Sequence, residues 1–238
     1  MGKSNIICMI PARIGSQRFK KKNLALIQDK TVLEWGIEAA IKSNIFDKII
    51  VNGDHPYFNE IAYSKNVDFY ERNKALGSSE TKSDDVIMDF LNVHNTKYLV
   101  WFNAIAPFQS NDDIKGFVGK LTNGLYHSMF AVRTNYIQAL YKDKPINYNE
   151  DDKFAKTQDL NPIKSFVPSL MGWDAACFQN YYKKNDHGLF CGSTGYYEVS
   201  TLSTLVIKKE TDFRLIRSFI EGISTYYDPI EYYQKVNK

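Results

Sequence analysis

The sequence predicts an α/β fold in which helices cover both faces of a mostly parallel sheet. Short apolar runs alternate with helical patterns over the first 70 residues. These segments are 5–10, 31–41, 48–51, 57–64 and 67–70. Strands that alternate with helices in this way favour a parallel sheet with helical crossovers. The later run 98–102 has no polar alternation, which is typical of a strand buried on both faces.

The composition suits one domain, spanning 1–238, in the cytoplasm. A chain of 238 residues with 44% hydrophobic residues can bury one sizeable core. Its net charge of +3 is not arranged in a long basic stripe, which argues against nucleic-acid binding. No stretch approaches about 20 apolar residues, so we expect neither secretion nor a membrane span. The three cysteines lack metal-type spacing, and their use fits a reducing compartment.

The first strand, 5–10, leads into a basic turn that is the strongest candidate for a ligand site. Five cationic side chains lie between Arg13 and Lys22, together with Gly15 and Ser16. Gly15 lets the backbone approach a ligand, Ser16 adds a hydroxyl donor, and the cations can neutralise a multiply charged anion. The turn is therefore a candidate triphosphate cradle, with a solvated basic loop as the alternative. It lacks the glycines of a P-loop or a dinucleotide-binding turn, which disfavours a redox enzyme.

The elements that follow have clear local signals. Residues 24–30 form a short edge segment with a turn, and Thr31 to Glu34 reads as a capping box that opens a helix. We expect the apolar face of that helix to carry Leu33, Ile37, Ala40 and Ile41. Further helices are predicted at 57–64, at 83–93 and from 111, where Asn111, Asp112 and Asp113 cap the helix or sit in its first turn.

The second half gives weaker signals. A strand is predicted at 127–132, late strands at 175–178 and 203–207, and a final helix from 211. Residues 134 to 171 show no clear period. A long irregular stretch in a compact chain is usually functional or an interface arm.

Two short motifs of the basic turn match a known family. Ala12-Arg13-Ile14-Gly15-Ser16, followed by Lys22-Asn23-Leu24, resembles the N-terminal signature of the CMP-acylneuraminate synthetases. These cytidylyltransferases activate sialic acids and related 2-keto sugar acids with CTP. Gln17 stands where the family has a lysine. The resemblance implies a Rossmann-like fold of the nucleotide-diphospho-sugar transferase kind.

Other segments match this family in part. Residues 70–79 resemble its nucleotide-binding segment, with Arg72 and Ser78 matching, and Asn103 and Gln109 stand where the family has glutamine and arginine. Asp54 follows the second strand, where the family has Ser-Thr-Asp, and only this aspartate matches. Asp54 is either a ligand-binding residue or a cap on the next helix. The resemblance implies nucleotide binding by Ala12, Arg13, Gly15, Ser16, Lys22, Asn23, Arg72, Ser78 and Asn103. Asp54, Gln109 and Asp174 are the candidates for substrate binding.

The metal site departs from the family pattern. The two aspartates that hold Mg²⁺ in the family fall on Val206 and Lys208, and neither can bind Mg²⁺, which requires oxygen ligands. Three explanations stay open. Other carboxylates could hold the ion, with Asp54, Asp174 and Glu210 as candidates; Lys208 could supply a fixed cation; or the protein could bind without turnover.

The resemblance implies a cytidylyltransferase that transfers CMP from CTP to an acidic sugar, with Mg²⁺ as its cofactor. Arg13 and Lys22 would be the catalytic cations, because both can neutralise charge on the triphosphate. The alternative is a catalytically degenerate relative that binds a nucleotide or a sugar acid as a regulatory or scaffold subunit. The resemblance also implies a homodimer, with residues 134–171 as the dimerisation and substrate arm.

Overall fold

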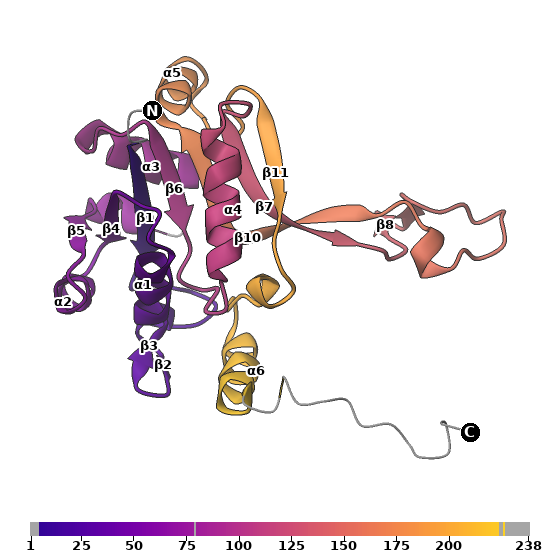
Figure 1. The fold of residues 1–238 in the computed structure, drawn as a ribbon, viewed down its shortest axis with the longest axis horizontal. Coiled ribbons are helices and arrows are strands. Elements are labelled where there is room, and N and C mark those ends of the chain that lie inside the picture. Colours follow the sequence, from indigo (N-terminus) through magenta and orange to yellow (C-terminus); the bar gives the residue numbers. More distant parts are fainter. Residues whose placement is uncertain (1–4, 79, 224–225, 227–238) are drawn as a thin grey trace.

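A computed structural model describes residues 5–78, 80–223 and 226, and it confirms the predicted α/β architecture (Figure 1). The strands of its main sheet are β1 (Ile6–Ala12), β4 (Lys48–Gly53), β5 (Asp68–Glu71), β6 (Tyr98–Phe102), β7 (Ser128–Asn135), β10 (Ile163–Asp174) and β11 (Thr194–Glu198). They lie in the order β11-β7-β10-β6-β1-β4-β5. Only β10 runs antiparallel to its neighbours, β6 and β7. The sheet is therefore mixed and mostly parallel.

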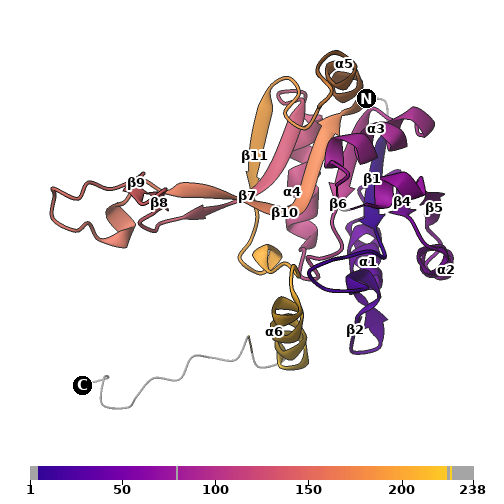
Figure 2. The same ribbon diagram turned by 180° about the vertical axis from the view of Figure 1, so that it is seen from behind.

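Helices cover both faces of this sheet (Figures 1 and 2). They are α1 (Val32–Ser43), α2 (Pro56–Ser64), α3 (Ser83–Val93), α4 (Asn111–Thr122), α5 (Ala175–Asn185) and α6 (Glu210–Glu221). The apolar sides of α1, α2 and α4 pack in one core cluster, whereas α3 and α5 pack in a second cluster on the opposite face. Helix α6 belongs to a third, smaller cluster beside the loop that follows β6.

Local capping explains where α1 and α4 begin. The Thr31 hydroxyl accepts from the amide of Glu34, and the Glu34 carboxylate accepts from the amide of Thr31, so the predicted capping box is confirmed. Ser110 rather than Asn111 caps α4, since its side chain accepts from the amide of Asp113. Ile41, predicted on the apolar face of α1, is 43% exposed.

Strands β7 and β10 extend beyond the sheet as a two-stranded arm, which Figure 1 shows projecting from one side of the molecule. The short strands β8 (Leu140–Tyr141) and β9 (Lys144–Pro145) pair with each other within it. The prediction of an irregular stretch over 134–171 is wrong for its last part, because β10 begins at Ile163. The pairing register of β10 shifts between Phe166 and Met171, which interrupts the strand pattern in the sequence.

Two late strands predicted from apolar runs are wrong. Residues 175–178 open helix α5, because the Asp174 carboxylate accepts from the amide of Cys177 and caps the helix. Residues 203–207 include part of a 3₁₀ turn, Leu202–Thr204, and a loop that joins no sheet. That loop is still buried at Ile207, whose amide donates to the carbonyl of Ile105 at 2.9 Å.

The described part of the chain contains no helix long and apolar enough to cross a membrane. All three cysteines are free thiols: Cys8 and Cys191 are buried and Cys177 is half-buried.

Close packing at Gly36 holds α1 against the loop that follows β6. A Cβ atom at Gly36 would lie 2.5 Å from the Cβ atom and 2.6 Å from the Cα atom of Ala104. We expect Gly36→Ala to lower the free energy of unfolding by about 1–3 kcal/mol, because the helix must move away from the loop.

Gly119→Ala is the matched control in urea denaturation of both variants. Gly119 is an exposed position within α4, and a Cβ there would meet nothing within 4 Å. This change should stabilise the protein by about 0.5–1 kcal/mol through helix propensity alone. Equal effects of the two substitutions would refute the packing argument.

Candidate functional site

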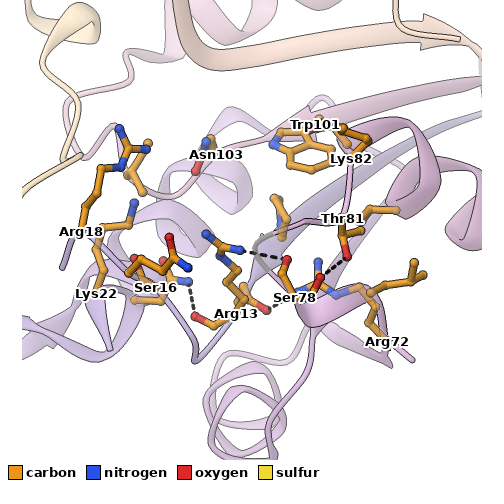
Figure 3. A pocket seen from close by; sticks show the side chains of 18 of the residues that line it. Arg13, Ser16, Arg18, Lys22, Arg72, Ser78, Thr81, Lys82, Trp101 and Asn103 are labelled. Carbon is orange, nitrogen blue, oxygen red and sulfur yellow. Dashed lines mark hydrogen bonds between the residues drawn. The ribbon is translucent and has the colours of Figure 1, made fainter. Parts of the chain in front are cut away.

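A cavity of about 440 Å³ opens beside the carboxyl ends of β1 and β6 (Figure 3). Its walls come from these two strand ends, from the loop after β1, from residues 72–83 and from Lys208. Strands β4 and β6 lie on opposite sides of β1, so the strand order of the sheet reverses at β1. The cavity lies at this switch point. In open α/β sheets, ligands bind at such a point.

The backbone of the loop after β1 is fixed by polar side chains from other parts of the chain. Ile14 donates its amide to the Asp54 carboxylate at 2.9 Å. The Arg72 guanidinium donates to the carbonyl of Ala12 at 3.2 Å, and the Asn23 amide donates to the carbonyl of Arg13 at 3.4 Å. These contacts set the direction in which the loop leaves the sheet.

Arg72 and Asp54 form a buried ion pair beneath this loop. Their side chains are 4% and 7% exposed, and the nearest charged atoms are 3.7 Å apart. Burial, the main cause, lowers the pKa of Arg72, although Asp54 opposes the shift. Since a guanidinium keeps its charge in proteins, the pair remains ionic and each charge depends on the other.

Six cationic residues line the cavity, and none of the described residues that line it is acidic. The cations are Arg13, Arg18, Lys22, Arg72, Lys82 and Lys208. Of the cations that Figure 3 labels, Arg13, Arg18 and Lys22 come from the stretch after β1, and Arg72 and Lys82 come from the stretch between β5 and α3. The Arg13 guanidinium donates to the carbonyl of Ser78 at 3.2 Å, so it bridges the loop after β1 to the segment 72–83. The cavity is therefore a site for an anion with several charges.

The surroundings of Lys22 lower the pKa of its ammonium group. Burial, and then the positive charges of Arg18 and Arg13, lower its pKa to about 8, against a smaller opposing effect of Asp212. Its ammonium donates to the carbonyl of Ile207 at 3.1 Å. A bound anion would relieve this repulsion, so Lys22 is prepared for an anionic ligand.

The wall opposite the basic loop presents hydroxyl groups and one aromatic ring. The hydroxyls of Ser78 and Thr81 lie 3.1 Å apart, and Ser83 lies next to them at the start of α3. The Trp101 indole also lines the cavity, and its buried N–H has no hydrogen-bond partner within the described structure. This wall can offer a flat apolar surface and polar donors to one ligand.

Most of the predicted nucleotide-binding residues meet at this cavity. Those that line it are Ala12, Arg13, Ser16, Lys22, Asn23, Arg72, Ser78 and Asn103. Gly15 lies in the same loop, and a Cβ atom at this position would meet nothing within 4 Å. Among the lining residues that the sequence did not single out for the site, Thr81, Lys82 and Ser83 lie at the start of α3 and Trp101 lies on β6; the others are the apolar residues Pro11, Leu76, Val86 and Ile105. The polar run just before α3 is the sequence signal that could have pointed to Thr81, Lys82 and Ser83.

The three predicted substrate-binding residues do not line the cavity. Asp54 lies beneath the basic loop, as described above. Asp174 pairs with Tyr98 at the opposite end of β6, where it caps α5. The Gln109 side chain is 6% exposed, and its amide has no hydrogen-bond partner in the described structure.

The residues present do not fit a protein-bound Mg²⁺ site. The candidate Glu210 pairs with Arg214 at 2.6 Å on the exposed side of α6, and Asp54 and Asp174 are engaged as described. Within the described ranges, no group of three or more His, Cys, Asp or Glu side chains could hold a metal ion. Mg²⁺ is bound by oxygen ligands, and Val206 and Lys208 supply none from their side chains.

One family model and several known proteins match the chain. A family model described as cytidylyltransferase matches residues 7–232. The N-acylneuraminate cytidylyltransferase of Escherichia coli O18:K1:H7 is 36% identical over 114 residues, which are 47% of this chain and 27% of that protein. The chain thus aligns with only about a quarter of that relative.

Two relatives from Campylobacter align over more of their length. The post-translational flagellin modification protein B of Campylobacter coli is 25% identical over 235 residues, covering 92% of this chain and 96% of that protein. The pseudaminic acid cytidylyltransferase of Campylobacter jejuni serotype O:2 is 25% identical over 172 residues, covering 67% and 73%.

Solved structures confirm the fold. A CMP:2-keto-3-deoxy-manno-octonic acid synthetase complexed with CTP matches with a TM-score of 0.71 at 12% identity, covering 92% of this chain and 100% of that one. A 4-diphosphocytidyl-2C-methyl-D-erythritol synthase from Anaerococcus prevotii matches with a TM-score of 0.66 at 11% identity, covering 92% and 99%. At such identities the similarity shows the fold alone.

Proposed function

Because the chain belongs to the cytidylyltransferase family, we propose that it transfers the CMP group from CTP to an acidic sugar and releases pyrophosphate. A hydroxyl oxygen of the sugar forms a bond to the α-phosphorus of CTP. The bond from that phosphorus to the oxygen it shares with the β-phosphate breaks, pyrophosphate leaves with that oxygen, and the hydroxyl proton passes to solvent. The observation that carries the proposal is the cavity at the end of β1: among the described residues, six cations and no acids line it.

The cations of the basic loop have the central part in this reaction. Arg13 and Lys22 neutralise charge that develops on the triphosphate, and such electrostatic stabilisation is usually the largest contribution to catalysis. Ser16 and the amides around Gly15 position the phosphates. Asn23 holds the loop through the carbonyl of Arg13.

The remaining walls complete the nucleotide site in this proposal. Arg72 keeps the carbonyl of Ala12, and with it the loop, in place. Ser78 and Asn103 lie on two sides of the cavity and offer polar groups to the ribose or the base.

The names of the relatives support an acidic sugar as the acceptor. Two of them are cytidylyltransferases for N-acylneuraminate and pseudaminic acid, which are sugar acids. The same names do not favour the alternative of a degenerate binding subunit.

We also propose a homodimer, because large apolar side chains on the arm are exposed: Ile137, Leu140, Tyr141, Ile146 and Phe154.

The direct test is product formation. The purified protein is incubated with CTP and a set of nine-carbon sugar acids, and the CMP conjugate and pyrophosphate are measured by mass spectrometry. One acid should give both products in equal amounts. Lys183→Ala removes an exposed cation from α5, which contributes no residue to the cavity, and should leave the rate unchanged. Failure to release pyrophosphate with any acid would refute the proposed reaction.

The lowered pKa of Lys22 predicts that CTP binding weakens at alkaline pH. Above pH 8 the free protein holds Lys22 neutral, so binding of the anion must take up a proton. The affinity should therefore fall by up to about tenfold per pH unit between pH 8 and pH 9.5.

Titration calorimetry of two variants checks the source of this effect. Lys22→Arg keeps its charge throughout and should bind CTP with an affinity that does not change with pH. Lys22→Met should bind weakly at every pH. A wild-type affinity that is constant from pH 7 to 9.5 would contradict this prediction, because Lys22 would then either stay charged in the free protein or make no contact with the anion.

A further inference from the structure

The loop that carries Lys208 brings a second lysine to the wall formed by Lys22. Ile207 anchors this loop through its amide, which donates to the carbonyl of Ile105, and its own carbonyl accepts the Lys22 ammonium at 3.1 Å. Lys208 follows directly and lines the cavity, with an exposed side chain. Lys22 and Lys208 thus line the same cavity from segments that are hydrogen-bonded to each other. Arg18 lies beside Lys22 (Figure 3).

Two carboxylates that hold the chain around this loop, Asp212 and Asp113, are engaged with protein groups. Asp212 accepts from the amides of Lys208 and Lys209, each at 2.8 Å. Asp113 accepts from the hydroxyls of Ser200 and Ser203 at 2.6 Å. Neither acid lines the cavity. A metal ion would therefore find no carboxylate of the described chain among the residues that face the ligand.

The charges in the cavity are enough to replace a metal ion. Among the residues that the structure describes, six cations line it and the Asp54 carboxylate offsets Arg72 beneath the loop, which leaves five positive charges. A fully ionised nucleoside triphosphate carries about four negative charges. Fixed ammonium and guanidinium groups bind phosphate oxygens through charge-assisted hydrogen bonds, which are the stronger kind.

We propose that this chain binds metal-free CTP, with Lys208 as a phosphate-binding cation and no metal ion coordinated by the protein. The inference rests on the proposed function, because it concerns the same nucleotide. It assigns Lys208 to contact with the triphosphate beside Lys22. A divalent ion that neutralises part of the phosphate charge then gives no gain in affinity.

The test is titration calorimetry of the full chain with CTP, once with EDTA and once with excess Mg²⁺. The affinity in EDTA should equal or exceed that in Mg²⁺. An affinity that falls about tenfold or more on removal of Mg²⁺ would overturn the inference while leaving the proposed function intact. If CTP binds under neither condition, the proposed function itself fails.

Two neighbouring lysines give a matched pair of variants for the same titration. Lys208 and Lys209 are both exposed, but only Lys208 lines the cavity, and both changes to aspartate alter the net charge equally. In EDTA, Lys208→Asp should weaken CTP binding by about tenfold or more, and Lys209→Asp by less than about threefold. Equal losses in the two variants would remove Lys208 from the site. Thermal unfolding of both proteins checks that each is folded.

Discussion

Arg13→Ala is expected to lower the rate of CMP transfer by about 10²- to 10³-fold, which is typical when one donor to the developing charge is lost. Arg13 stands at the end of β1, lines the cavity and is oriented by the carbonyl of Ser78. Its planar guanidinium can bind two phosphate oxygens at once, which no neighbouring group replaces.

Measuring the rate of CMP transfer by Arg13→Lys distinguishes the effect of the positive charge from that of the guanidinium shape. This variant keeps the positive charge but loses the forked donor, so its rate should lie between those of the wild type and the alanine variant. The side chain is half-buried at the surface of the cavity, so the melting temperature should change little. An Arg13→Ala protein with a near-normal rate would remove Arg13 from the mechanism.

Asp54→Ala is expected to lower the free energy of unfolding by about 3–5 kcal/mol, because it leaves Arg72 as a buried charge without its partner. The same change removes the acceptor for the amide of Ile14, which leads into the basic loop. Chemical denaturation measures the loss directly.

Asp54→Asn provides the comparison for this prediction. Asparagine keeps an oxygen that can accept from Ile14 but cannot balance the charge of Arg72, so the loss of stability should be smaller than for alanine. If Asp54 instead binds substrate, as one reading of the sequence suggested, both variants would lose activity with normal stability. That result would contradict the buried ion pair.

The parallel part of the fold could be predicted because its signals are local. Continuous apolar runs mark β1, β4 and β6, and capping residues such as Thr31 mark the helix starts between strands. The end of the chain could not be predicted in the same way. The run 175–178 is too short to separate a strand from a helix by its pattern, and only the cap at Asp174 settles it.

The arm was missed as a sheet element for a related reason. β10 changes register between Phe166 and Met171, so its alternation is broken where the strand passes from the arm into the core sheet. Strand β11 pairs with β7 across 66 positions of sequence, as in Thr194 with Ser128, and pairing over that distance leaves little local signal.

The candidate site could likewise be predicted only in part. The basic loop was predictable, because one stretch of sequence supplies Arg13, Ser16 and Lys22. In the sequence Trp101 has the pattern of a core residue of β6, and only the structure shows that it lines the cavity. Asp54 follows a strand as ligand-binding residues do, but its partner Arg72 is known only from the structure.

The most direct test of the central claim is a calorimetric titration of the wild-type protein and Arg13→Ala with CTP, UTP, ATP and GTP. We expect CTP alone to bind the wild type at one site per chain, and Arg13→Ala to bind it at least about tenfold more weakly. Equal affinity for all four nucleotides, or binding of none, would contradict a CTP-dependent enzyme built around the basic loop.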